Sequence, residues 1–118
     1  MKSYTMKKIR GVPDWKNIPV ISIDTLLWTD SIDVSAQAQI CYDGECLHLR
    51  LEAVEPNIRM EEQGLLAEVC EDSCLEFFLR PTERMDYFNI EMNPNRVLYL
   101  GFGTSLEKIG PGVSAWVR

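Results

Sequence analysis

Thiols and carboxylates are concentrated in the stretch CEDSCLEFFLR, residues 70–80. Cys70 and Cys74 stand close together there, and Glu76 is a carboxylate inside the alternating segment that follows. Thiolates and carboxylates can ligate metals, and carboxylates also act as catalytic acids or hold ligand hydroxyls. The chemistries to weigh are therefore a metal site, a redox site, a catalytic acid and a ligand-binding face.

The spacing of the four cysteines does not predict a metal site. Structural zinc sites combine a cysteine pair on a tight turn with a second pair or with histidines. Cys41 and Cys46 have a spacing that zinc sites use, but the hairpin predicted between them makes them a cross-strand pair on one face. We expect buried or half-buried thiols, because a Cys41–Cys46 disulfide would require an oxidising compartment.

Catalytic motifs do not occur in the sequence, which has no G-x-S-x-G, no Gly-rich phosphate loop and no H-E-x-x-H. The single histidine, His48, is predicted on the solvated face of a hairpin. Glu76 and Glu91 could form an acid pair as in glycoside hydrolases, but neighbouring strands would hold them too close for the inverting geometry. No catalytic residue is predicted, and we do not expect an enzyme.

Polar side chains alternate with apolar ones in LEFFLR and again in DYFNIEMN. The polar set consists of Glu76, Tyr87, Asn89, Glu91 and Asn93. Carboxylates, amides and a phenol supply the donors and acceptors that sugar hydroxyls require. Flat aromatic side chains that could stack on a sugar are those of Trp28, Trp116 and Trp15. The pattern indicates a saccharide-binding face; the other interpretation is a solvated strand face.

Composition and charge are those of one globular domain. The chain has 118 residues, of which 46% are hydrophobic and 25% charged. A net charge of −6 argues against nucleic-acid binding, which needs a clustered basic surface. The first residues contain no apolar segment typical of a signal peptide, and no stretch reaches the roughly 20 apolar residues of a membrane span. We expect a cytoplasmic protein without membrane contact, or a secreted one if a signal peptide has been removed.

Residues 1–19 are predicted to form an extended lead-in, and residues 20–118 a single β-domain. A strand is predicted in VISIDTLLW, and a hairpin in AQAQICYDGECLHLRLEAV. Taking Asp43-Gly44 as its two-residue turn pairs Ile40 with Leu47 and Gln39 with His48. One face is then apolar: Ala36, Ala38, Ile40, Leu47, Leu49 and Leu51. The opposite face is polar and is expected to be solvated.

Further strands are predicted over 74–80, in DYFNIEMN, in RVLYLGF and in VSAWVR, with a loop over 55–69. Leu75, Phe77 and Leu79 are expected to fill the core. Short strands separated by turn signals predict an all-β, antiparallel β-sandwich. VSAWVR still alternates where the sequence stops, which leaves open an incomplete sandwich whose open edge would pair with a second copy.

The run EDSCLEFFLRP, followed by DYFNIEMNPNRVLYLGFG, resembles the carbohydrate-binding family 9-like domains of the DOMON-like β-sandwich group. The upstream stretch AQAQICYDGECLHLRLEAVEPNIR is similar to that family's first hairpin. The resemblance implies a jelly-roll-like sandwich that holds a sugar between two tryptophans and binds it through acid and amide side chains. In this sequence the matching acid is Glu76, and the next strand supplies Asn89, Glu91 and Asn93.

The sequence therefore predicts a non-catalytic carbohydrate-binding, or carbohydrate-binding-derived, module. The alternative is a protein-interaction or structural β-sandwich with a decayed sugar site, because Cys70 stands where the resemblance places a stacking tryptophan. No cofactor is expected. Calcium is left open although no EF-hand-like spacing occurs, and no Met and His pair is singled out as haem ligands.

Overall fold

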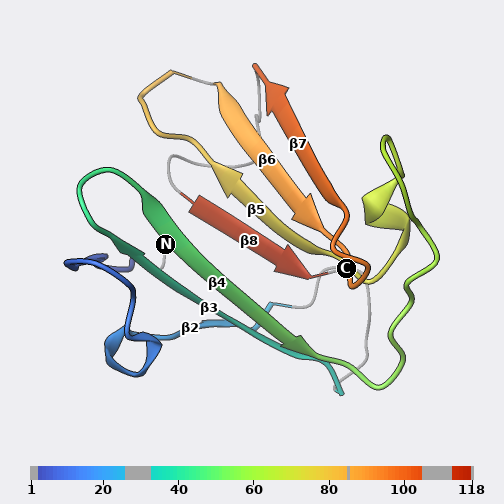
Figure 1. Ribbon diagram of the computed structural model, residues 1–118, viewed down its shortest axis with the longest axis horizontal. Helices are drawn as coiled ribbons and strands as arrows, with labels where there is room; N and C mark the ends of the chain where they lie inside the picture. The colour runs from blue at the N-terminus through green and yellow to red at the C-terminus, as the bar shows by residue number, and fades with distance from the viewer. Residues whose placement is uncertain (1–2, 26–32, 85, 105–112, 118) are drawn as a thin grey trace. The chain divides into compact units, whose positions relative to one another are not determined.

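The computed structural model describes residues 3–25, 33–84, 86–104 and 113–117. The chain divides into two compact units, Met1–Val54 and Glu55–Arg118. Each unit has its own four-stranded sheet (Figure 1). Among the described residues, no helix is long and apolar enough to cross a membrane.

The first unit is built around one central strand. In chain order its elements are β1 (Lys7–Lys8), the 3-10 helix η1 (Trp15–Asn17), β2 (Ile21–Ile23), β3 (Ser35–Tyr42) and β4 (Leu47–Val54). Strand β4 pairs antiparallel along the whole of β3. Strands β1, which is parallel, and β2, which is antiparallel, pair with different parts of β3. The strand predicted in VISIDTLLW is thus confirmed over Ile21–Ile23, and its last three residues lie outside the described ones.

The hairpin between β3 and β4 is confirmed, but its predicted register is wrong. Tyr42 pairs with Leu47, so Ile40 faces Leu49 and Cys41 faces His48 instead of Cys46. The Asp43 carboxylate accepts hydrogen bonds from the backbone N–H groups of Glu45 and Cys46, both at 2.9 Å. The Asp43 N–H also donates to the Cys46 carbonyl at 3.3 Å, and this backbone bond makes Gly44-Glu45 the two central residues of the turn.

The shift is explained by the chemistry of the turn. Gly44 has φ +103°, a positive value at the first central position, as type II′ hairpins require. The register differs from the predicted one by two residues on β4. Because side chains alternate with a period of two, the apolar and polar faces of the hairpin keep their predicted members. The cross-strand cysteine pair does not form, and none of the four cysteines is in a disulfide. Cys41 and Cys74 are buried and Cys70 is half-buried, as expected, whereas Cys46 is exposed.

The Asp43 side chain predicts an acid-dependent stability for this unit. Hydrogen bonds from the Cys46 N–H, the His48 ring at 2.8 Å and the Glu45 N–H hold the pKa of Asp43 well below its ordinary value. A lowered folded-state pKa stabilises the fold above the unfolded value of about 3.9, and this stabilisation is lost as the pH falls toward the folded value. We expect Asp43→Asn to lower Tm by roughly 3–6 °C at pH 7. Thermal unfolding from pH 2 to 7 should show the difference constant above pH 5 and shrinking below pH 4. A difference that does not change with pH would contradict this account.

The polar face of β3 is not solvated as predicted, because the N-terminal segment covers part of it. Gln39 is buried, and its amide nitrogen donates to the carbonyl oxygens of Trp15 and Ile18, each at 2.7 Å. The Tyr4 hydroxyl donates to the Pro19 carbonyl at 2.6 Å. The segment predicted as an extended lead-in therefore carries a short strand and a 3-10 turn. The domain boundary at residue 20 stays a prediction.

The second unit holds the strands that carry the predicted site. Its elements are the 3-10 helix η2 (Val69–Glu71), β5 (Leu75–Leu79), β6 (Tyr87–Met92), β7 (Leu98–Gly103) and β8 (Val113–Val117). They form an antiparallel sheet in the order β7-β6-β5-β8 (Figure 1). The four strands predicted from residue 74 onward are confirmed, and the predicted loop is confirmed as far as residue 68, where η2 follows. Phe77 is buried, and Leu75 and Leu79 are half-buried.

Two largely antiparallel sheets confirm the predicted all-β, sandwich-type fold class. The segment VSAWVR is a strand because β8 pairs with β5. Among the described residues, β7 pairs only with β6 and β8 only with β5, so both are edge strands. Association of two copies through such an edge stays a prediction.

The turn from β6 to β7 predicts a stabilising substitution. The Arg96 N–H donates to the Asn93 carbonyl at 3.0 Å, which closes a turn. Pro94 occupies the second position of this turn, where type I turns favour proline. Arg96 then has φ +63°, a conformation in which a Cβ is unfavourable and glycine is preferred. We expect Arg96→Gly to raise Tm by about 3–5 °C in thermal unfolding. Arg96→Ala keeps the Cβ and should give no such gain; an equal gain would show that the backbone conformation is not the cause.

Candidate functional site

The register of the second sheet brings the predicted acids together. Glu76 of β5 pairs with Glu91 of β6 on one side and with Trp116 of β8 on the other. Glu91 in turn pairs with Tyr99 of β7. Directly paired residues point to the same face of a sheet. We call this face the glutamate face; its described members are Glu76, Phe78, Tyr87, Asn89, Glu91, Tyr99, Gly101 and Gly103.

The two glutamates are buried side by side. Glu76 is 5% exposed and Glu91 9%. One ligand atom from each, together with Sγ of Cys74, lies within 4.8 Å of the others. Burial, with the neighbouring Glu76 and Glu91 carboxylates, raises the pKa of the Cys74 thiol to about 12. Because metals and electrophiles react with the thiolate, this thiol is poorly suited to either role at neutral pH.

Asn89 completes the polar centre of the glutamate face. Its Nδ2 donates to Oε1 of Glu91 at 2.6 Å. Its Oδ1 is buried and accepts no hydrogen bond from the described residues. Buried acceptors in proteins nearly always have a partner, which can be an ordered water or a ligand. Asn89 thus offers an acceptor, and Glu91 keeps lone pairs that its bond to Asn89 does not use.

Asn93, also predicted as a sugar contact, is engaged within the protein. Its Nδ2 donates to the Glu62 carbonyl at 2.9 Å and to Asp72 Oδ2 at 3.0 Å, and its Oδ1 accepts from the Val97 N–H at 3.0 Å. Both amide hydrogens are therefore used. Asn93 is buried, and its described bonds brace the loop and the β6–β7 turn.

Asp72 anchors the same loop. Its carboxylate accepts from the backbone N–H groups of Glu61 and Glu62, both at 2.9 Å. Burial alone would raise the pKa of Asp72, but these bonds, with that of Asn93 and the charge of Arg59, hold it below its ordinary value. The carboxylate is ionised and fully engaged, so its role is structural.

The structure describes some aromatic residues of the predicted site but not all of them. Trp116 is the β8 partner of Glu76 in the strand register, whereas Trp28 lies outside the described residues. Tyr87 packs against Phe78 with ring centroids 5.9 Å apart. Tyr99, paired with Glu91, was missed by sequence reasoning. The signal that could have found it is the alternation in YLGFG, which places two glycines after a tyrosine on one strand face.

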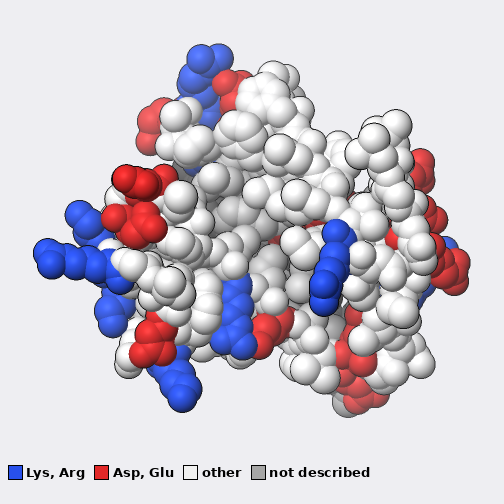
Figure 2. Space-filling model, in the orientation of Figure 1, with Lys and Arg blue, Asp and Glu red and all other residues white. Residues whose placement is uncertain are grey.

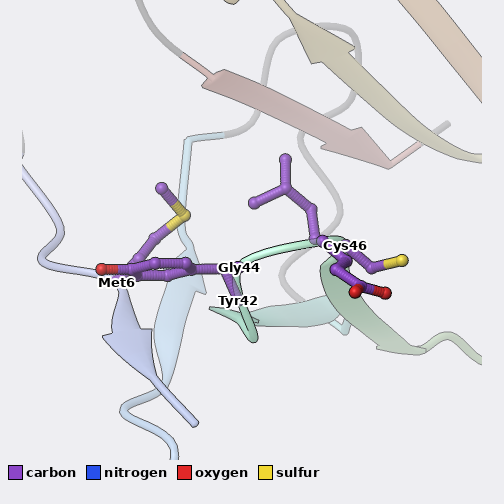
Figure 3. Close-up of a pocket in the computed structure, with 6 residues that line it drawn as sticks. Met6, Tyr42, Gly44 and Cys46 are labelled. Carbon is purple, nitrogen blue, oxygen red and sulfur yellow. The ribbon is translucent and has the colours of Figure 1, made fainter.

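A separate hollow lies in the first unit, at the tip of the β3–β4 hairpin. Its lining consists of Met6, Tyr42, Gly44, Glu45, Cys46 and Leu47. Figure 3 shows the Tyr42 ring beside Met6, with the sulfur of Cys46 directed away from them. The hollow is open and mostly apolar, and no predicted site residue lines it. Binding pockets usually combine apolar walls with several converging polar groups, so the glutamate face is the stronger candidate.

Comparisons with known proteins bear on the family of the chain. The sequence profile of carbohydrate-binding family 9 matches residues 9–111. A solved structure from Bacteroides uniformis, of a protein to which carbohydrate binding has been ascribed, superposes with a TM-score of 0.77 at 25% identity. The match covers 96% of this chain and 57% of that one. No curated protein matches the chain.

Proposed function

Since the chain belongs to carbohydrate-binding family 9, we propose that it is a non-catalytic module that binds a saccharide on its glutamate face. The observation that carries the proposal is the juxtaposition of Glu91 and Asn89. Their 2.6 Å hydrogen bond orients a carboxylate and an amide on adjacent positions of one strand face. Such a pair can accept hydrogen bonds from neighbouring hydroxyls of one sugar ring.

The other predicted contact residues differ in how directly they could meet the sugar. Glu76 is less exposed than Glu91, so a sugar hydroxyl would have to reach below the level of Glu91 to meet it. Tyr87, the first residue of β6, can offer its hydroxyl group to the sugar. Asn93 would contribute indirectly, by stabilising the loop and turn to which it is hydrogen-bonded.

The separation of the two carboxylates argues against an inverting glycosidase. Retaining glycosidases hold their two carboxyl groups about 5–5.5 Å apart, and inverting enzymes about 6.5–9.5 Å apart. Oxygens of Glu76 and Glu91 lie within 4.8 Å, on directly paired residues of adjacent strands. This separation is shorter than the inverting geometry requires.

The proposal is tested by calorimetric titration of the chain with a panel of neutral mono- and oligosaccharides. We expect saturable binding of at least one of them. If no saccharide of the panel binds to a chain that circular dichroism shows to be folded, the proposal is contradicted and a protein-interaction module is favoured. Charge gives little reason to expect an anionic polymer instead, because Figure 2 shows Lys and Arg on the face in view spread over several places, among acidic residues.

A further inference from the structure

We propose that the ring of Tyr99 is the surface on which the sugar stacks, and that Gly101 is present to seat that ring. This inference rests on the proposed function, and it names a contact that family membership does not supply. Tyr99 is the β7 partner of Glu91, and Gly101 is the β7 partner of Asn89. The ring therefore belongs to the same part of the face as the carboxylate and the amide.

The glycine positions show where the tyrosine rings lie. A Cβ built on Gly101 would stand 2.9 Å from Cε1 and 3.0 Å from the hydroxyl oxygen of Tyr99. A Cβ on Gly103 would stand 2.3 Å from the same atoms of Tyr87. At these separations a side chain on either glycine would have to displace the tyrosine ring. Each glycine on this face of β7 is thus covered by a tyrosine ring.

An aromatic ring over a strand glycine can serve stability alone, because it covers backbone that the glycine leaves bare. That reading suits Tyr87, which is half-buried and packed on Phe78. Tyr99 differs because it is 48% exposed and lies on an edge strand of the described sheet. A ring that rests on backbone with one side and keeps half of its surface in solvent is a platform for a flat apolar ligand surface.

The neighbouring groups define the class of ligand. A pyranose presents C–H groups on the faces of its ring and hydroxyls around its edge. Stacking of a C–H face on Tyr99 would bring edge hydroxyls to Glu91 and Asn89, which the register places beside the ring. The paired carboxylates and the net charge of −6 would repel an anionic sugar. The ligand is therefore a neutral pyranose or an oligosaccharide of such units.

The test compares the parent chain with four variants by titration against glucose, galactose, mannose, xylose, their common disaccharides and glucuronate. We expect Tyr99→Ala to weaken binding about tenfold or more and Tyr99→Phe to stay within about threefold. Tyr99→Leu still covers Gly101 but has no flat ring, so it should behave as Tyr99→Ala does. Leu100→Ala is the matched control, because Leu100 is 65% exposed on the opposite face of the same strand and should not matter.

The outcomes separate this inference from the proposed function. If the parent binds no sugar, the proposed function fails and the stacking role fails with it. If the parent binds and Tyr99→Ala or Tyr99→Leu binds as tightly, the stacking role alone is overturned. An independent readout needs no sugar: the ring should shift the Gly101 Hα resonance upfield in the parent but not in Tyr99→Ala. Absence of that shift would overturn the seated-ring geometry.

Discussion

Replacing Asp72 by alanine is expected to lower Tm by roughly 10 °C or more, the largest stability effect of any substitution considered. The carboxylate accepts hydrogen bonds from the backbone N–H groups of Glu61 and Glu62 and from one amide hydrogen of Asn93, and these three donors lose their acceptor at once. Buried donors without an acceptor are strongly unfavourable. Thermal unfolding monitored by circular dichroism measures the effect.

Two further variants, one intermediate substitution and one control, test this prediction even if Asp72→Ala does not fold. Asp72→Asn retains one acceptor oxygen and should fall between parent and alanine variant, even if the latter does not fold. Asp86→Ala is the matched control, because Asp86 makes a surface ion pair with Arg84 at 2.9 Å and such pairs contribute little. Limited proteolysis should also cut the 55–68 loop faster in Asp72→Asn than in the parent. Equal Tm values for Asp72→Ala and Asp86→Ala would contradict the anchoring role.

Replacing Glu91 by glutamine should move stability and binding in opposite directions. Loss of a charged acceptor at the centre of the face is expected to weaken saccharide binding about 10- to 100-fold. Removing one of two carboxylates that lie side by side relieves repulsion between like charges, so Tm should rise by a few degrees. Opposed changes of this kind are typical of residues that serve function at the expense of stability.

The control for Glu91→Gln is Glu83→Gln, which makes the same change of charge on an exposed connection. It should leave both Tm and affinity unchanged. If Glu91→Gln lowers Tm and affinity together, Glu91 stabilises the sheet, and its binding role is not established by that variant. If affinity is unchanged while Tm rises, Glu91 does not contact the sugar.

Strand positions and faces could be predicted from the sequence because they follow from alternation, which is local. The β3–β4 register could not, because two turns were compatible with CYDGEC. The choice between the two turns depends on which backbone N–H groups donate hydrogen bonds to the Asp43 carboxylate. The resulting shift of two residues changed every cross-strand partner but no face.

The candidate site was predictable in part for the same reason. Alternation placed Glu76, Asn89 and Glu91 on one face, and antiparallel pairing brought them together. Burial of Gln39 was not predictable, because a segment more than twenty residues earlier in the chain supplies its partners. Tyr99 was overlooked because its importance comes from the absence of side chains at Gly101, which shows only when the ring is seen above it.

The most direct test of the central claim is chemical-shift mapping of the isotopically labelled chain during titration with the saccharide that binds best. A sugar on the glutamate face should perturb the amides of Asn89, Glu91, Tyr99 and Gly101 first. The amides of Leu47 and the β3–β4 turn should stay unchanged. Perturbations confined to that turn, or to residues far from β6 and β7, would place the ligand elsewhere and contradict the account.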